Sequence, residues 1–515
     1  MLLTLAITAI APLAVADDSK SAASPPANRY FRITVVDSQT GRGVPLVELT
    51  TVSGIVHVSD SAGVVAFHEP GLMDQEVFFT VRSHGYTFPA DGFGFAGTRL
   101  RVTPGGSAVL KVDRVNIAER LYRITGGGIY RDSVLLGDRP PLREPVLSGK
   151  VLGQDSVQRA LYRGRIYWFW GDTNRPAYPL GNFTMSGATS ELPPPKGRGL
   201  DPSVGIDLRY FTDAEGFSRP MCPIEGQPGP VWCDGFVTCA DGRGGEQLLC
   251  RFARIRTLGE IYEQGFARFN DEREVFEPVC RIPNDAALFM RGIPVRVTHA
   301  EGDYWYFPTP FPLIRCRADQ DSLLDVSRYE AFTCLKPGTR YDADKPQIER
   351  DDTGRIVYAW KRDTGVVLQA EQEDLIRNGH IKPEEALIRL QDAATGKTVR
   401  GHSGTVAWNA HRGRWIMIAQ EAFGSSFCGE IWYAEAPELV GPWEQARKII
   451  THDDYSFYNV VHHPFFDQEG GRLIYLEGTY TRAFSGTKTP TPRYDYNQVM
   501  YRLDLADERL RQRPR

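Results

Sequence analysis

RGRIYWFWGDT, at residues 163–173, places a glycine turn between two arginines and follows it with isoleucine and aromatic residues. A glycine turn before β-branched and aromatic residues is typical of the second strand of a β-hairpin. Looser copies begin near residues 244, 301, 353, 412 and 470. They recur about every 50–80 residues, which is typical of the blades of a β-propeller. The chain is therefore predicted to be all-β, with a propeller over residues 145–505.

The number of blades depends on the copy near residue 353. This copy lacks a preceding strand of its own and is followed by a helical pattern at residues 371–390. Pro383 lies near the expected start of a second short helix, a position where proline is well tolerated. Five blades are therefore favoured, with the helical segment as an insertion, and six blades are the alternative.

The chain begins with an apolar stretch, MLLTLAITAIAPLAVA at residues 1–16, which precedes a polar stretch at residues 17–28. The apolar stretch is too short to cross a membrane and ends in small residues, as a secretory signal peptide does. The polar stretch is rich in serine, alanine and proline and has the composition of a linker. The mature protein is therefore predicted to be secreted or periplasmic, with cell-surface attachment as a further option and no membrane span.

The overall composition and the cysteines narrow the class of protein. The formal net charge of -4 leaves no basic surplus that would suit nucleic acid. Eight cysteines are present, and the first four, at residues 222, 233, 239 and 250, lack the paired C-x2-C spacing of a zinc site. No metal site is therefore predicted. In an exported protein the cysteines are expected to be largely oxidised, in pairs that their spacing leaves open.

Residues 29–115 form a separate region of short strand patterns divided by turn residues. Several short strands without a helical pattern indicate a small β-sandwich. The phrases DSQTGRGVP (37–45) and SDSAGVVAF (59–67) resemble the transthyretin-like regulatory modules of secreted carboxypeptidases and of bacterial surface proteins. This resemblance implies a scaffolding role. Residues 116–144, interrupted by glycines and prolines, are expected to connect the sandwich to the propeller.

Candidate site residues follow from the geometry of a blade. Its first strand lines the channel and its second strand runs antiparallel, so the start of the first and the end of the second share one rim. Converging acids at that rim raise one another's pKa, as a general acid requires. Any one of the residues selected in this way could equally belong to a turn or to the end of a strand. Their expected convergence at one rim is what indicates a site. The rule selects Asp155, Asp172, Asp234, His402, Glu421, Asn459 and Glu477.

Aromatic side chains near the same rim favour a carbohydrate ligand. Flat aromatic surfaces bind the apolar faces of sugar rings, while polar side chains bind the hydroxyl groups. We expect His463 to contact the substrate or to pack against the channel wall. The predicted substrate-binding residues are Trp170, Asp234, His402, Tyr458, Asn459 and His463.

Three segments resemble the five-bladed propeller glycosidases, which include arabinanases, β-xylosidases and fructosidases. They are GQDS (153–156), IYWFWGDTN (166–174) and EIWYAEAPELVGPWEQARKI (430–449). A closer likeness is to an uncharacterised-domain family that contains secreted endo-D-arabinanases. The resemblance implies that Asp155 is the base or nucleophile and Glu421 the general acid, with Glu477 and Glu430 as rivals for the acid. The expected third-blade aspartate has no counterpart, because that strand reads RGIPV at 291–295.

The sequence therefore predicts a secreted glycoside hydrolase that acts on a polysaccharide or oligosaccharide. Paired carboxylates among Asp155, Glu421, Asp172 and Glu477 would perform acid–base catalysis at one mouth of the propeller, by retention or inversion. No cofactor is predicted, although the channel could hold a structural cation. One alternative is a non-catalytic carbohydrate-binding propeller. The other is a polysaccharide lyase whose base is His402, His463 or Tyr458.

Overall fold

The computed structural model describes residues 29–182, 184–194, 197–226, 229–257 and 259–511. The predicted signal peptide and linker (1–28) lie outside the described residues. The described chain is mostly β-strand, which confirms the predicted class, and none of its helices has the length and apolar character of a membrane span. The α-helices are α1 (Arg131–Leu135), α2 (Gln320–Leu323) and α3 (Gln369–Arg377).

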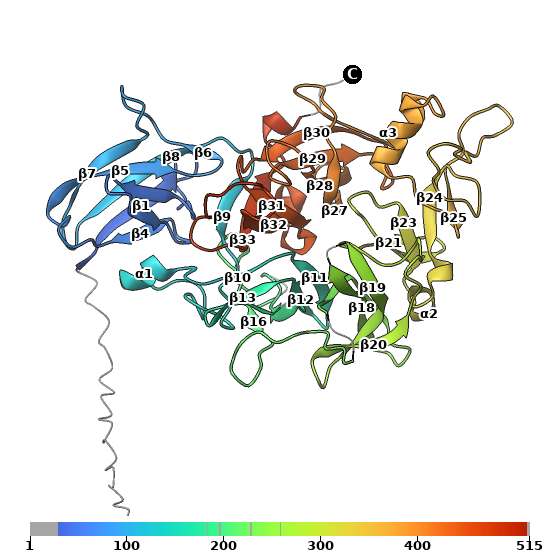
Figure 1. Cartoon of the computed structure of the whole chain (residues 1–515), viewed down its shortest axis with the longest axis horizontal. Helices are drawn as coiled ribbons and strands as arrows, with labels where there is room; N and C mark the ends of the chain where they lie inside the picture. Colours follow the sequence, from blue (N-terminus) through green and yellow to red (C-terminus); the bar gives the residue numbers. More distant parts are fainter. Residues whose placement is uncertain (1–28, 183, 195–196, 227–228, 258, 512–515) are drawn as a thin grey trace, which may run out of the picture.

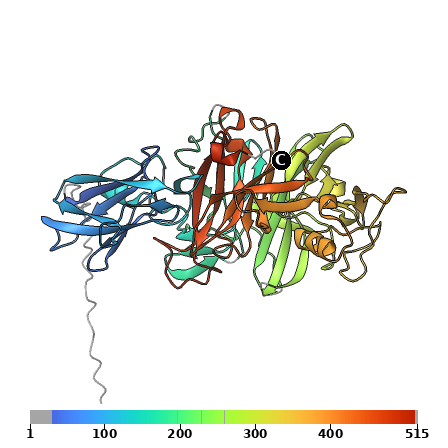
Figure 2. The same ribbon diagram turned by 90° about the horizontal axis from the view of Figure 1, so that it is seen from above.

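Two four-stranded sheets form an N-terminal module, residues 31–114, which lies to one side of the remaining chain (Figures 1 and 2). Burial alternates along its first strand, as expected of a strand with one face on a core. Both sheets contribute to one hydrophobic cluster, which contains Ile33, Phe67 and Phe79. One sheet contains β1 (Phe31–Asp37), β4 (Val64–Phe67), β6 (Tyr86–Thr87) and β8 (Ser107–Arg114); the other contains β2 (Glu48–Thr51), β3 (Val56–Val58), β5 (Gln75–Arg82) and β7 (Gly97–Val102).

Five sheets of four or five strands follow in sequence order around a common centre, and none of them closes on itself within the described residues (Figure 1). The first contains β11 (Gln158–Tyr162), β12 (Arg165–Trp170), β15 (Ser186–Ser190) and β16 (Arg209–Tyr210). Beside it lies a three-stranded sheet of β10 (Gly153–Gln154), β13 (Thr173–Arg175) and β14 (Tyr178–Asn182). The second contains β17 (Val231–Ala240), β18 (Glu246–Thr257), β19 (Glu260–Asn270) and β20 (Val275–Arg281).

The third sheet contains β21 (Val295–His299), β22 (Gly302–Tyr306), β23 (Ile314–Arg317), β24 (Glu330–Thr333) and β25 (Ala359–Arg362). The fourth contains β26 (Ile388–Asp392), β27 (Gly401–Asn409), β28 (Arg414–Glu421), β29 (Ile431–Ala436) and β30 (Trp443–Ile450). The fifth contains β31 (Ser456–His462), β32 (Leu473–Thr481), β33 (Asn497–Asp504) and β9 (Glu119–Arg123).

The repeated phrase marks the second strand of one hairpin in each of these five sheets. Its copies coincide with β12, β18, β22, β28 and β32, and each pairs antiparallel with the strand before it. The copy near residue 353 instead precedes β25, the last strand of the third sheet. The predicted helical insertion follows as α3 and a short 3-10 helix at Pro383–Glu385.

Strand β9 changes the boundary expected at residues 116–144. The sequence suggests only a connecting segment there, yet β9 pairs antiparallel with β33, the last strand of the fifth sheet. The Arg123 Nε atom donates to Asn497 Oδ1 at 2.8 Å, and both side chains are buried. This pairing joins the two ends of the five-sheet region.

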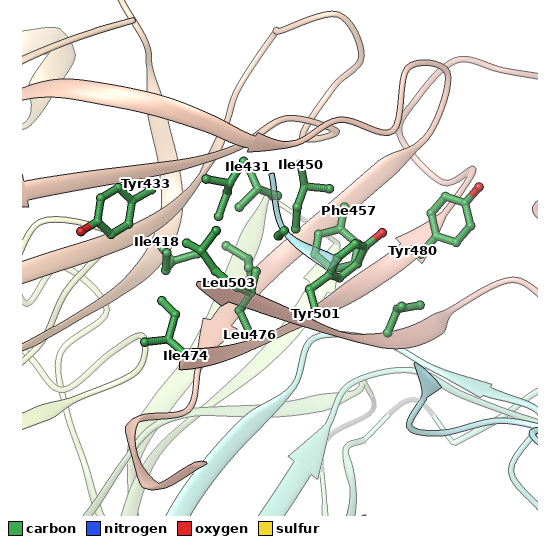
Figure 3. Packing of buried hydrophobic residues seen from close by; sticks show 14 of the residues in the cluster. Ile418, Ile431, Tyr433, Ile450, Phe457, Ile474, Leu476, Tyr480, Tyr501 and Leu503 are labelled. Atoms are coloured by element: carbon green, nitrogen blue, oxygen red, sulfur yellow. The ribbon is translucent and has the colours of Figure 1, made fainter. Parts of the chain in front are cut away.

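Neighbouring sheets bury a continuous apolar layer. Ile418 and Tyr433 of the fourth sheet belong to one cluster with Ile474, Leu476 and Leu503 of the fifth (Figure 3). These side chains are at most 2% exposed. Removing such area from water is the main favourable contribution to folding, so this layer fixes how the sheets lie against one another.

The expected oxidation of the cysteines is wrong for this structure. All eight cysteines are free thiols, and all except the half-buried Cys280 are buried. Cys222, Cys233 and Cys250 belong to one hydrophobic cluster, whereas Cys334 belongs to another. Free cysteine behaves as a small apolar side chain, so these residues fill the core without disulfide bonds, although Cys233 forms side-chain hydrogen bonds with Cys222 and Cys250.

Thiol titration checks this state. Because no cysteine is bonded, denatured but unreduced protein should react with a thiol reagent at all eight positions. A reduced sample serves as the control for complete reaction. Finding four or fewer reactive thiols in the unreduced sample would contradict the structure.

Candidate active site

Strands from four different sheets end at one cavity of about 610 Å³. The cavity has a mixed lining, with aromatic side chains beside carboxylates and amides, as ligand sites commonly do. Six of the predicted site residues line it: Asp155, Asp172, Asp234, His402, Tyr458 and Asn459. Glu421, Glu477, Trp170 and His463 are not among its lining residues.

Asp155 and Asp172 are held together by the backbone of the first sheet. Asp155 precedes β11 and Asp172 follows β12, which are hairpin partners. The Gly171 amide donates to the Asp155 carbonyl oxygen at 2.8 Å, and the Asp155 amide donates to the Asp172 carbonyl oxygen at 3.3 Å. A Cβ atom at Gly171 would lie 2.3 Å from Asp155 Oδ1, so a larger residue would displace this carboxylate.

The two carboxyl groups have raised pKa values. Burial raises the pKa of Asp155 to about 7, and the Asp172 carboxylate raises it further, while a hydrogen bond from Tyr458 opposes the shift. Burial raises the pKa of Asp172 to about 6. Since neighbouring acids titrate as a pair, the site holds about one proton midway between pH 6 and pH 7. It therefore offers a proton donor and a carboxylate in one cavity.

Tyr458 and Asn459 reach the cavity because β31 is irregular there. Its register with β32 shifts between Tyr458 and Val461, and Asn459 has a φ of 52°. The Tyr458 Oη atom donates to Asp155 Oδ2 at 2.6 Å, and Asn459 Nδ2 donates to Ser156 Oγ at 2.6 Å. The bulge thus connects the fifth sheet to the carboxylate pair, as bulges near active sites often do.

Left-handed backbone is concentrated at this cavity. Residues other than glycine with positive φ cost roughly 1–3 kcal/mol each and persist where the surrounding structure holds them, often at functional sites. Among the lining residues these are Ser156, Met185, Cys428, Asn459, Phe484 and Tyr496.

On the other side of the cavity Asp234 is already neutralised. Arg251 Nη1 donates to Asp234 Oδ1 at 3.1 Å, and the Arg251 guanidinium lies 4.5 Å from the centre of the Phe289 ring. Asp234 can still accept a ligand hydrogen bond, although one of its oxygens is engaged by Arg251.

His402 belongs to a network centred on Gln420, a buried residue that the sequence did not single out. Gln420 Nε2 lies 2.9 Å from His402 Nδ1, and Gln420 Oε1 accepts from the Asn459 amide. Partial desolvation lowers the pKa of His402. The ring is therefore neutral at physiological pH and suits hydrogen bonding to a neutral ligand.

The predicted sugar platform Trp170 is a core residue instead. Its side chain is fully buried and stacks on Trp168 with 6.4 Å between ring centroids. The last residue of a strand still faces one side of its sheet, and here that side is the interior. Trp170 is therefore inaccessible to a carbohydrate.

Glu421 is the last residue of β28, and its rival Glu430 directly precedes β29. Glu421 Oε2 accepts from Trp432 Nε1 at 2.7 Å. Glu430 is fully buried and forms an ion pair with Lys448 at 2.7 Å. Neither side chain lines the cavity, so the structure does not bring the expected general acid to Asp155.

Glu477 and His463 form a fully buried pair, with 3.1 Å between Oε2 and Nε2. The sequence pattern places Glu477 at the end of its strand, and hence at the channel rim. In the structure β32 continues to Thr481, so Glu477 lies inside the strand and not at its end. Burial raises the pKa of Glu477 to about 8 and lowers that of His463 well below its usual value. The pair is therefore uncharged at neutral pH and belongs to the core.

The cavity also contains residues that the sequence did not indicate. Ser156 directly follows Asp155 and could have been inferred from that neighbour. Phe484 and Tyr496 come from an irregular loop after β32, where no periodic pattern points to a site. The residues missed include Ser156, Trp232, Arg251, Gln420, Phe427, Phe484 and Tyr496. Across the described part of the chain, no group of three or more His, Cys, Asp or Glu residues is placed to hold a metal ion.

Comparisons with known proteins give weak likenesses. No protein-family profile and no curated protein matches the sequence. The structure of a protein from Bacteroides ovatus that is described as a hydrolase is 12% identical to this chain, with a TM-score of 0.39. The match covers 68% of this chain and 86% of that protein. An exo-1,5-α-L-arabinanase from a bovine ruminal metagenomic library is 9% identical, with a TM-score of 0.34, and the match covers 68% of this chain and 93% of the arabinanase. A mutant α-L-arabinofuranosidase from Fusarium graminearum is 12% identical, with a TM-score of 0.33, and the match covers 76% of this chain and 99% of the arabinofuranosidase. At these values the likeness assigns neither a fold nor an activity.

The core assignment of Glu477 is testable through pH-dependent stability. Its folded pKa of about 8 lies above the ordinary value of 4.5, so its stabilising contribution is complete below about pH 4.5 and is lost as pH rises through 8. Glu477→Gln keeps a polar contact with His463 and removes the titration. The melting temperature of the wild type should fall relative to that of the variant between pH 5 and pH 8.5.

Activity provides the control for this experiment. A core role predicts that Glu477→Gln keeps activity within about threefold, whereas a general acid would lose about 10²–10⁴-fold. Loss of activity on that scale, without a change in pH-dependent stability, would contradict the core assignment.

Proposed function

We propose that this chain is a glycoside hydrolase that acts on a polysaccharide or oligosaccharide, with Asp155 and Asp172 as its catalytic carboxylates. One observation carries the proposal: two adjacent aspartates face one cavity with pKa values of about 7 and about 6. Glycoside hydrolysis requires one protonated and one ionised carboxyl group beside the scissile bond. A purely carbohydrate-binding protein would gain nothing from burying such a pair.

The cavity walls suit a sugar ligand. Trp232, Phe427, Phe484 and Tyr496 contribute aromatic surface, and Asn459, His402 and Arg251 contribute polar groups. The volume of about 610 Å³ lies within the range of small-ligand sites, roughly 300–1,000 Å³. Aromatic surface beside neutral hydrogen-bonding groups favours a neutral, ring-shaped substrate.

The proposed reaction uses each aspartate in the protonation state that its surroundings favour. Asp155 has the higher pKa of the pair, so it takes the acid role here and not the base or nucleophile role that the family resemblance implies. Protonated Asp155 donates its proton to the glycosidic oxygen as the bond to the anomeric carbon breaks. Ionised Asp172 either removes a proton from the attacking water or attacks the anomeric carbon itself. The Tyr458 hydroxyl, 2.6 Å from Asp155 Oδ2, stabilises the carboxylate that remains after proton transfer.

The lyase alternative is less well supported with Tyr458 as its base. A lyase base must accept a proton, yet the Tyr458 hydroxyl already donates to Asp155. Burial and the neighbouring carboxylates raise the pKa of Tyr458 well above its usual value. A tyrosine with a raised pKa is a poor base at neutral pH.

The remaining parts of the proposal concern architecture and location. Five sheets, each of which contains one hairpin marked by the repeated phrase, together with the β9–β33 pairing support a five-bladed propeller. The two sheets of the N-terminal module and its DSQTGRGVP phrase support a transthyretin-like β-sandwich. The GQDS phrase containing Asp155 supports kinship with propeller glycosidases, and the apolar stretch at residues 1–16 supports export.

Substitution of the pair tests the activity on a panel of plant, algal and bacterial glycans. Asp155→Asn and Asp172→Asn should each lower the release of reducing ends about 10²–10⁴-fold, because each removes a proton donor or acceptor. Absorbance of unsaturated products, measured in parallel, detects a lyase. Glu421→Gln is the matched control and should stay near wild type, since Glu421 lies outside the cavity. Near-normal turnover by both aspartate variants, with unchanged melting temperatures, would exclude these roles.

The pH profile supplies an independent prediction. The value of kcat/KM should fall below about pH 6, as Asp172 becomes protonated, and above about pH 7, as Asp155 loses its proton. Tyr458→Phe removes a hydrogen bond that lowers the pKa of Asp155, so the alkaline limb should move to higher pH. Cys428→Ser, another cavity residue without a contact to Asp155, serves as the control. A limb that stays in place or moves to lower pH would contradict the assignment of the acid.

A further inference from the structure

The loop between β32 and β33, residues 482–496, provides Phe484 and Tyr496 to the cavity. It is much longer than a typical hairpin loop of roughly 2–5 residues. Three of its residues, Phe484, Arg493 and Tyr496, have φ values of 64°, 70° and 57°. Left-handed residues of this kind persist only where surrounding contacts hold them. The contacts that hold this loop therefore shape the cavity.

The ends of the loop are held by the five-sheet region. Ser456 Oγ donates to the carbonyl oxygen of Ala483 at 2.7 Å. At the other end, the Gln154 amide donates to the carbonyl oxygen of Tyr496 at 3.0 Å. Ser456 begins β31, which carries Tyr458 and Asn459, and Gln154 directly precedes Asp155. These bonds position the two ends and leave the middle of the loop to other contacts.

Arg493 ties the loop to the N-terminal module. Its Nη2 atom donates to the carbonyl oxygen of Val58, in β3, at 2.5 Å and to Asp132 Oδ2 at 3.0 Å. Asp132 in turn accepts from the amide of Ala66, in β4, at 3.0 Å. The side chains of Arg493 and Asp132 are only 16% and 4% exposed. Charge-assisted bonds with so little solvent access are strong and cost much to break.

A second contact reaches the loop through an aromatic residue. The His84 ring of the module lies edge-on to Tyr455, with 4.6 Å between ring centroids. The Tyr455 hydroxyl donates to the carbonyl oxygen of Pro490 at 3.2 Å. The module thus reaches the loop at two points, residues 490 and 493. Figure 1 shows the module beside the fifth sheet, from which this loop extends.

We propose that the N-terminal module is part of the substrate-binding apparatus, because it holds the loop 482–496 in the conformation that places Phe484 and Tyr496 against the cavity. Arg493 is the principal positioning residue, and it does not touch the reacting atoms. This inference rests on the proposed glycosidase function for its kinetic consequence. Its structural consequence, a loop held by the module, is independent of that function.

Arg493→Ala in the full-length chain tests the proposal. Losing the module contact should raise KM for an oligosaccharide about tenfold and leave kcat within about twofold, since Asp155 and Asp172 keep their surroundings. Arg493→Lys, which retains a positive charge near Asp132 but has a shorter reach and lacks the guanidinium, should restore part of the affinity. Thr40→Val is the matched control, because it removes a 2.7 Å contact between the module and Glu119 of β9 without touching the loop.

Hydrogen–deuterium exchange provides a readout that needs no substrate. Amides of residues 482–496 should exchange at least tenfold faster in Arg493→Ala than in the wild type or in Thr40→Val, while β27 and β31 stay protected. This result would support the proposal even if no glycan were cleaved. Equal protection of the loop in Arg493→Ala and Thr40→Val would overturn it. Faster exchange throughout β27 and β31 in both Arg493 variants would also overturn it, because Arg493 would then support the whole fold and not the loop.

Discussion

The pairing of β9 with β33 is the contact on which the rest of the structure depends. It joins the strand before the first sheet to the last strand of the fifth sheet, so the two ends of the five-sheet region hold each other. Strand β9 also contacts the N-terminal module, since the Arg123 amide donates to Ser61 Oγ at 3.1 Å. Next to β33, the Tyr496 carbonyl oxygen accepts from the Gln154 amide, directly before Asp155. One antiparallel pairing thus fixes the sheets, the module and one edge of the cavity.

Asp155 and Glu477 differ in whether they face a cavity, and this difference decides which of them belongs to a candidate site and which to the core. Burial raises the pKa of both Asp155 and Glu477. Asp155 faces a cavity together with a second carboxyl group, and its proton can pass to a ligand. Glu477 faces His463 inside the protein, where neither group meets a ligand. A perturbed pKa therefore indicates function only when the geometry gives the group something to react with.

Local sequence patterns predicted a large part of the fold and six of the residues that line the candidate cavity. The glycine turn and aromatic run identified the second strand of one hairpin in each sheet of the five-sheet region, because hairpin formation depends on neighbouring residues. Asp155 and Asp172 followed from the same hairpin, whose geometry is local. Glu477 and Trp170 were misplaced for two separate reasons. The rim rule needs the end of each strand, and β32 runs past Glu477 to Thr481, while Trp170 at the end of β12 faces the interior.

The residues of this chain determine its strands, its hairpins and the aspartate pair, since these arise from turn chemistry and side-chain alternation over a few positions. The partner of β9, the free state of the cysteines and the aromatic cavity wall at Phe484 and Tyr496 depend on the folded protein. Each of these features arises from contacts between residues far apart in the sequence, such as Arg123 with Asn497 and Arg493 with Val58. No local periodicity records such contacts, because they form only when the buried layers between sheets set the distances.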